Sequence, residues 1–161
     1  MDVNPDFRDL LRLFNDAGSR YLVVGAHAVA YHAEPRYTKD LDLWVEPSPA
    51  NAHRVFEALT RFGAPLNGVN SDLFADPDMV YQIGIEPNRI DVVMGMEALT
   101  FATAWRRRVR SSYGGVPVSI LSKTDLIRNK CAVARAQDLL DVGRLRSRPR
   151  SRVKKRRRKR T

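Results

Sequence analysis

The chain contains one cysteine, Cys131, and three histidines among its 161 residues. A single cysteine excludes an intramolecular disulfide framework of the kind that stabilises small secreted domains. So few cysteines and histidines also argue against a zinc site built from these two ligand types. We therefore expect a cytoplasmic protein that is held together by an ordinary hydrophobic core.

Long apolar runs are missing as well. No stretch approaches the ~20 consecutive apolar residues that a membrane-spanning helix needs. The N-terminal segment, MDVNPDFRDL, is acidic and lacks the basic start of a signal peptide. We expect no membrane association, and the length suits one main domain with its own core.

Acidic residues are absent from the last 18 positions. Residues 144–161 hold 12 of the 28 Lys and Arg, whereas residues 1–143 hold all 18 acids and carry a net charge of −2. The net charge of +10 therefore comes from the tail, whose composition predicts disorder over 144–161 after a domain over 1–143. Two interpretations stay open: the tail binds RNA or DNA phosphates without sequence preference, or it is an extension without a role. The residues assigned to nucleic-acid binding are Arg152, Lys154, Lys155, Arg156, Arg157, Arg158, Lys159 and Arg160.

Helix-like and strand-like patterns alternate along the rest of the chain. Helices are predicted over 5–18, 26–32, 51–62, 97–105 and 122–141. Strands are predicted over 21–25, 39–46, 69–75, 79–85 and 89–94, with a hairpin across Gly114 and Gly115. This order predicts an α/β fold with a mixed central sheet flanked by helices and a helical segment at its C-terminal end.

Two carboxylates stand out in the strand KDLDLWVE. Asp40 and Asp42 are two residues apart, so they share one face and lie roughly 6–7 Å apart along the strand. Burying two like charges is costly unless a cation neutralises them, and a divalent metal can do so. The alternative is that this face is simply exposed to solvent, as for any half-exposed strand.

A third carboxylate, Asp91, lies in the apolar strand RIDVVM. A lone acid among Ile90, Val92, Val93 and Met94 is unexpected unless it has a partner. If this strand pairs beside KDLDLWVE, the three acids converge and suit two metal ions that promote a phosphoryl displacement.

The turn Val24-Gly25-Ala26 joins the first strand to a helix. A glycine at this place lets the backbone approach a ligand closely, and the helix N-terminus offers free N–H groups to phosphate. A strand–glycine–helix junction is also common without any ligand.

The order of these segments resembles the nucleotidyltransferase fold of the DNA polymerase β superfamily. More closely, the stretch YLVVGAHAVAYHAEPRYTKDLDLWV resembles small bacterial nucleotidyltransferase-like proteins grouped with AbiEii-type abortive-infection toxins. The later stretch SILSKTDLIRNKCAVARAQDLLDV resembles their C-terminal helical motif. The resemblance covers about residues 5–143.

This resemblance implies roles for residues at matching positions. It places Asp40 and Asp42 as ligands of two Mg²⁺ ions, with Asp91 as the third carboxylate and the general base. Gly25 and Ala26 stand at the turn that holds the triphosphate of the NTP substrate.

Further residues match outside the strands. The resemblance implies that Lys130 and Asp138 complete the site, although a Lys at this position fits an exposed helix surface equally well. Arg36 and Thr38 precede the acids and are expected to touch phosphate or to fix the strand. Ala26 and Ala33 replace small residues of the family pattern, and neither replacement removes a metal ligand.

The function implied is Mg²⁺-dependent transfer of a nucleoside monophosphate from NTP to a hydroxyl of RNA, tRNA first, or of protein. The resemblance further implies a toxin role in a toxin–antitoxin or abortive-infection pair, with a partner encoded by the adjacent gene. Two alternatives remain: a catalytically weak or inactive binding protein that keeps the fold, and a nucleic-acid-binding module that acts through its basic tail.

Overall fold

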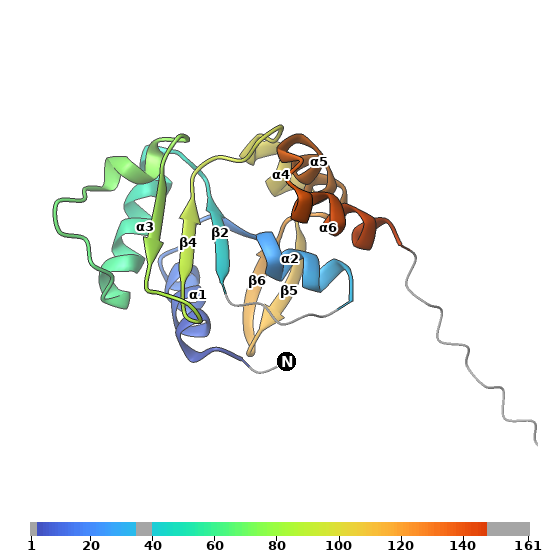
Figure 1. Cartoon of the computed structure of the whole chain (residues 1–161). Coiled ribbons are helices and arrows are strands. Elements are labelled where there is room, and N and C mark those ends of the chain that lie inside the picture. The colour runs from blue at the N-terminus through green and yellow to red at the C-terminus, as the bar shows by residue number, and fades with distance from the viewer. Residues whose placement is uncertain (1–2, 35–39, 148–161) are drawn as a thin grey trace, which may run out of the picture.

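The structure is a computed structural model, and it describes residues 3–34 and 40–147 (Figure 1). The predictions for Arg36, for Thr38 and for the basic run from Arg152 to Arg160 lie outside the described residues.

A six-stranded sheet forms the centre of the protein, in the order β3-β4-β2-β1-β6-β5. β1 pairs in parallel with β6, and β2 pairs in parallel with β4, whereas the β1–β2, β3–β4 and β5–β6 pairs are antiparallel. The strands are β1 (Tyr21–Val24), β2 (Leu41–Val45), β3 (Val80–Ile83), β4 (Ile90–Val93), β5 (Val109–Tyr113) and β6 (Val116–Ile120). This mixed sheet confirms the predicted fold class.

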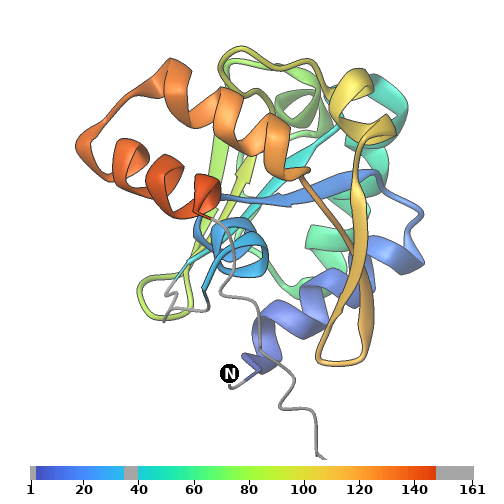
Figure 2. The same cartoon turned by 90° about the vertical axis from the view of Figure 1, so that its right-hand side faces the viewer.

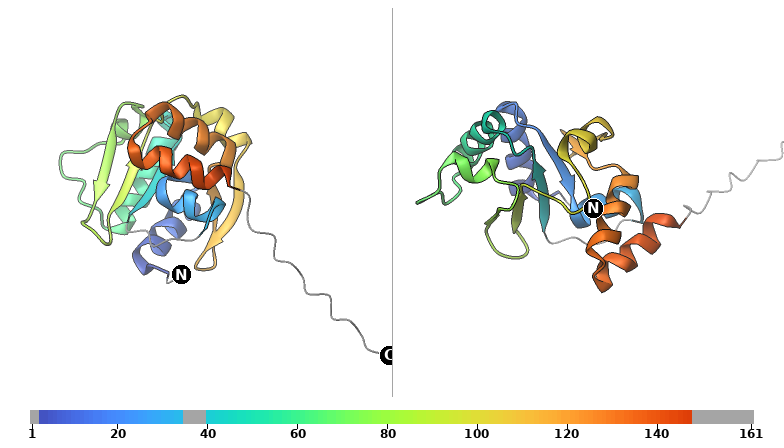
Figure 3. Two further views of the ribbon diagram at one scale, coloured as in Figure 1. Left: turned by 45° about the vertical axis from the view of Figure 1, so that its right-hand side comes forward. Right: turned by 90° about the horizontal axis from the view of Figure 1, so that it is seen from above.

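Helices cover the sheet on both faces (Figure 3). α1 (Pro5–Asp16) and α3 (Pro49–Phe62) pack together on one face, whereas α2 (Gly25–His32), α5 (Lys123–Val133) and α6 (Ala136–Arg146) gather on the other. The short elements η1 (Ser71–Ala75) and α4 (Phe101–Arg106) occur in the connections. None of the helices in the described ranges has the length and apolarity needed to cross a bilayer.

Local sequence explains where the first helix begins and which face it buries. The Asn4 side chain accepts hydrogen bonds from the first-turn amides of Asp6 and Phe7, so it caps α1 as its position before Pro5 predicts. The helix buries one apolar stripe against the core, consisting of Phe7, Leu10, Leu11 and Phe14.

Three sequence predictions need correction. The segment predicted as a strand over 69–75 is a 3₁₀ helix, because the Asn70 side chain caps it by accepting from the Asp72 amide. The helix predicted over 122–141 is two helices, since Ala134 adopts a left-handed conformation with φ of 55°. The domain also continues past residue 143, because α6 runs to Arg146 and fully buries Leu145.

Candidate active site

The sheet places Asp42 and Asp91 side by side. In the parallel pairing of β2 with β4, these two residues are direct neighbours across the strands. Asp40 precedes β2 by one residue and acts electrostatically on Asp42. The two acidic strands therefore pair, which meets the condition for the acids to converge, and three carboxylates lie at this junction.

Arg89 supplies positive charge to this cluster. Its Nη2 donates to Oδ2 of Asp40 at 2.8 Å, and its Nε lies 3.4 Å from Oδ1 of Asp91. Because Arg89 and Asp91 are two residues apart, the guanidinium and the carboxylate project from the same face of the strand. One guanidinium thus offsets part of the repulsion among three acids.

The side chain of Asp42 packs directly against the backbone of Gly25. A Cβ built at Gly25 would lie 2.0 Å from Oδ2 of Asp42, and Gly25 has a φ of +66°. Both observations exclude an ordinary side chain, since the space is filled and the conformation favours glycine. The turn and the carboxylate are therefore parts of one packed unit.

Burial and the charge of Asp91 raise the pKa of Asp42 to about 7. The proximity of the Asp91 side chain raises this pKa further. The nearby charge of Asp40 acts in the same direction, and Arg89 opposes it. An added cation would therefore compete with a proton for the Asp42 carboxylate.

The donor set fits Mg²⁺, which takes oxygen ligands. Among the described residues, Oδ1 of Asp40 and Oδ1 of Asp91 are buried without a hydrogen-bond partner. No group of three His, Cys, Asp or Glu side chains in that part of the chain is already arranged as a metal site. In this structure, the positive charge beside Asp40 and Asp91 comes from Arg89, which pairs with both carboxylates.

The N-terminus of α2 lies at the same junction. Val24 is its N-cap residue, and no side chain caps the helix, so its first amides can donate to an anion. Ala26 continues the helix, and Ala33 adopts an extended conformation after its last residue. Both alanines, which replace small residues of the family pattern, therefore fit without a positive φ.

The predicted pair of Lys130 and Asp138 is brought together by α5 and α6, whose packing is seen in Figure 2. Nζ of Lys130 lies 3.3 Å from Oδ1 of Asp138 and 3.0 Å from Oδ2 of Asp141, and all three residues are buried. Lys130 is therefore not the exposed helix residue of the alternative interpretation. It offsets two buried carboxylates, which would otherwise be costly.

Arg135, the residue before α6, pairs with this buried cluster. Its Nε donates to Oδ2 of Asp138 at 2.8 Å. That hydrogen bond raises the pKa of Arg135, and the charge of Asp42 adds to the increase. The turn between α5 and α6 therefore lies within electrostatic range of Asp42.

Sequence reasoning missed two residues of these clusters. Arg89 could have been predicted as a partner of Asp91, because a cation two residues before it falls on the same strand face. Asp141 could also have been predicted, because it follows Asp138 by three residues and shares its helix face.

The contact between Gly25 and Asp42 gives a stability prediction. Gly25→Ala should lower the free energy of unfolding by the ~1–2 kcal/mol of a left-handed alanine plus at least ~1 kcal/mol for the clash with Asp42. Gly18→Ala is the matched control, because its φ of +68° is nearly equal and no atom lies within 4 Å of the added Cβ. Equal losses for the two variants in urea denaturation would contradict the packed turn.

The raised pKa of Asp42 gives a pH prediction for the metal-free protein. Its carboxyl takes up a proton on folding, so the stability it supports is complete below about pH 4 and is lost as the pH rises toward 7. Asp42→Asn should therefore raise the melting temperature in EDTA more at pH 8 than at pH 5. The exposed Asp72→Asn serves as the control, and a pH-independent effect of Asp42→Asn would refute the prediction.

Comparison of the sequence with protein-family models and with curated proteins finds no match. Among solved structures, the chain is similar to the lincosamide antibiotic adenylyltransferase LnuA with lincomycin bound. The TM-score is 0.58 at 14% sequence identity, over 91% of this chain and 99% of that one. The protein therefore has a nucleotidyltransferase fold, as the sequence resemblance implies.

Proposed function

We propose that the protein transfers a nucleoside monophosphate from an NTP to a hydroxyl group in a Mg²⁺-dependent reaction. The observation that carries this proposal is the convergence of Asp40, Asp42 and Asp91 beside the Gly25 turn. Carboxylates of two paired strands and the amides of a helix N-terminus are the groups that a metal-bound triphosphate requires. The fold that the chain shares with LnuA, an adenylyltransferase by its name, is consistent with this chemistry.

Asp40, Asp42 and Asp91 would hold the two Mg²⁺ ions, which supply charge compensation for the phosphates when bound. The first amides of α2, at Gly25 and Ala26, would bind the triphosphate. The acceptor hydroxyl oxygen bonds to the α-phosphorus while the bond to the β-phosphate oxygen breaks, and pyrophosphate leaves.

The remaining proposed roles are proton transfer by Asp91 and phosphate binding by residues of the C-terminal helices. Asp91 would take the proton of the attacking hydroxyl, because its carboxylate lies next to Asp42 and its side chain keeps 14% of its exposure. Lys130, with Asp138, would complete the phosphate side, although both are engaged in a buried ion cluster in the unliganded protein. Arg36 and Thr38 are proposed phosphate or strand contacts.

The family resemblance proposes RNA as acceptor, with tRNA as its first candidate, or a protein hydroxyl. It also proposes a toxin role with a partner protein encoded beside this gene. The basic tail would then serve as an electrostatic tether for RNA.

A second candidate function is nucleotide-independent binding by a catalytically weak member of the fold. The ion pairs of Arg89 with Asp40 and Asp91 favour it, because they offset part of the carboxylate charge without a metal. Calorimetry with Mg²⁺ and NTP distinguishes the two, since this alternative expects no heat of binding.

A transfer assay tests the main proposal. The protein is incubated with Mg²⁺, α-labelled NTP and cellular RNA or protein, and label on the acceptor is measured. Asp42→Ala should reduce transfer to background, because it removes a metal-binding carboxylate, whereas Glu57→Ala on the exposed face of α3 should not change it. Transfer that survives Asp42→Ala would place the reaction elsewhere.

The tail interpretation is tested by RNA binding as a function of salt. Replacing the basic residues of the segment 152–160 with Gln should weaken binding of a short single-stranded RNA and flatten the salt dependence by about 0.7 per lost phosphate contact. The described fold ends before this segment, so its elements stay intact. Equal affinity and slope for both proteins would exclude the tether.

A further inference from the structure

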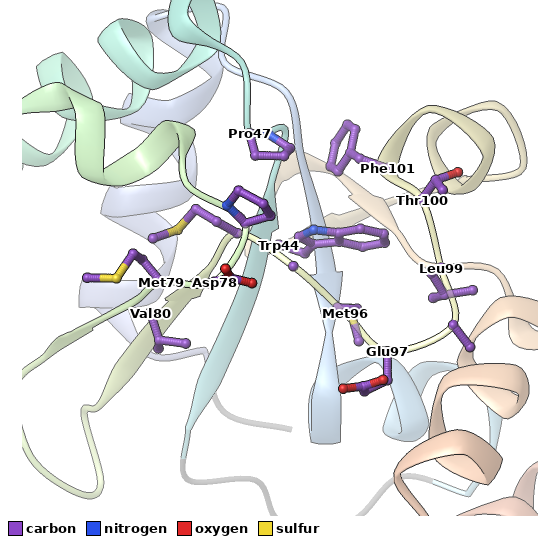
Figure 4. Close-up of a pocket in the computed structure, with 14 residues that line it drawn as sticks. Trp44, Pro47, Asp78, Met79, Val80, Met96, Glu97, Leu99, Thr100 and Phe101 are labelled. Atoms are coloured by element: carbon purple, nitrogen blue, oxygen red, sulfur yellow. The ribbon is translucent and has the colours of Figure 1, made fainter.

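A pocket of about 620 Å³ opens beyond the carboxyl ends of the parallel strands β2 and β4 (Figure 4). Trp44 is two residues after Asp42, so both side chains lie on the same face of β2. Its neighbour on β4, Val93, is likewise two residues after Asp91 and is followed by the pocket residue Met94. The pocket therefore begins one strand repeat beyond the carboxylates, at the place where open α/β sheets commonly bind ligands.

The pocket is apolar at its base and adaptable at its walls. Trp44 and Met94 are buried beneath it, and Trp44 packs edge to face against Phe101 at 5.2 Å between ring centres. Met79 and Met96 stand at its sides, so three of the four methionines of the chain line this one pocket. Flexible thioether side chains suit ligands of irregular apolar shape.

A loop and a helix hold the wall after β4 in place. The segment after β4 comes so close to the preceding loop that a Cβ at Gly95 would lie 2.3 Å from the Pro77 carbonyl oxygen. The Asn129 side chain donates to the Glu97 carbonyl at 3.1 Å, which ties the same segment to α5. The pocket is thus formed by segments that the fold fixes from two sides.

The charge of the lining is negative. Asp78 and Glu97 are exposed at the pocket, and none of the described residues that line it is Lys, Arg or His. Phosphodiester backbones need cationic partners, so this lining does not suit a polynucleotide. Carboxylates above an aromatic and Met-rich base suit a protonated amine carried on an apolar body.

We propose that this pocket binds the acceptor, and that the acceptor is a small amphiphilic molecule with a protonated amine and a hydroxyl group, in place of the RNA or protein acceptor that the family resemblance proposes. This role rests on the proposed nucleotidyl transfer. The apolar body packs over Trp44 and the methionines, the amine pairs with Asp78 or Glu97, and the hydroxyl reaches toward Asp91. There its oxygen bonds to the α-phosphorus, pyrophosphate leaves, and the proton goes to the Asp91 carboxylate.

The binding part is tested without nucleotide, by methyl NMR of the full chain labelled at its methionines. N-benzylethanolamine should shift Met79, Met94 and Met96 but not Met1. The matched neutral ether, 2-benzyloxyethanol, should bind about fivefold more weakly because it lacks the charge. The variant Asp78→Asn/Glu97→Gln should remove that preference, whereas Glu57→Gln on α3 should keep it.

Three outcomes would overturn the proposal: no shift with either compound, equal affinity for both, or larger shifts with a short RNA. The acceptor role is tested by adding Mn²⁺ and measuring relaxation of the bound probe. Its hydroxymethyl protons should relax faster than its ring protons, and the reverse order contradicts the role. Failure of Mn²⁺ to bind would count against the proposed function alone, because the methionine shifts do not depend on it.

Discussion

Mutual repulsion among three carboxylates is the constraint on which the candidate site depends. Asp42 and Asp91 are neighbours on paired strands, and their partial burial strengthens every charge interaction between them. The unliganded protein meets this repulsion with the guanidinium of Arg89 and with proton uptake by Asp42, whose pKa is raised to about 7. Any divalent cation that binds there must replace both, so metal affinity and proton release are linked at this site.

The backbone around the carboxylates is also restricted in its conformation. Asp42 fills the space that a side chain at Gly25 would need, so the strand, the turn and the start of α2 keep one arrangement. The pocket at Trp44 belongs to the same strand face, so an acceptor bound there shares its scaffold with the carboxylates. A nucleotide at the helix N-terminus and an acceptor at the pocket would then approach Asp91 from two directions.

The sequence predicted those parts of the fold whose signals are local. Strand alternation around Asp42 and the apolar neighbours of Asp91 predicted both strands, whereas their pairing was only a condition for the three acids to converge. The 3₁₀ helix at Ser71–Ala75 was not predicted. A five-residue segment is too short to show a helical repeat of apolar residues, and its conformation depends on the Asn70 cap. The pocket could not be predicted, since Trp44, Met79 and Phe101 come from segments that only the sheet brings together. Arg89 was not predicted, because the two carboxylates with which it pairs, Asp40 and Asp91, come together only in the folded sheet.

The ion cluster of α5 and α6 limits how Lys130 could respond to a bound nucleotide. Lys130 pairs with two buried carboxylates, Asp138 and Asp141, and Arg135 pairs with the first of them as well, so a Lys130 that turned to a phosphate would take its charge away from Asp141 above all. Removing one partner of such a buried cluster costs on the order of 3–5 kcal/mol. A triphosphate that recruited Lys130 would therefore compete with the contacts that join α5 to α6 across the bend at Ala134, so binding and the packing of these two helices would be coupled.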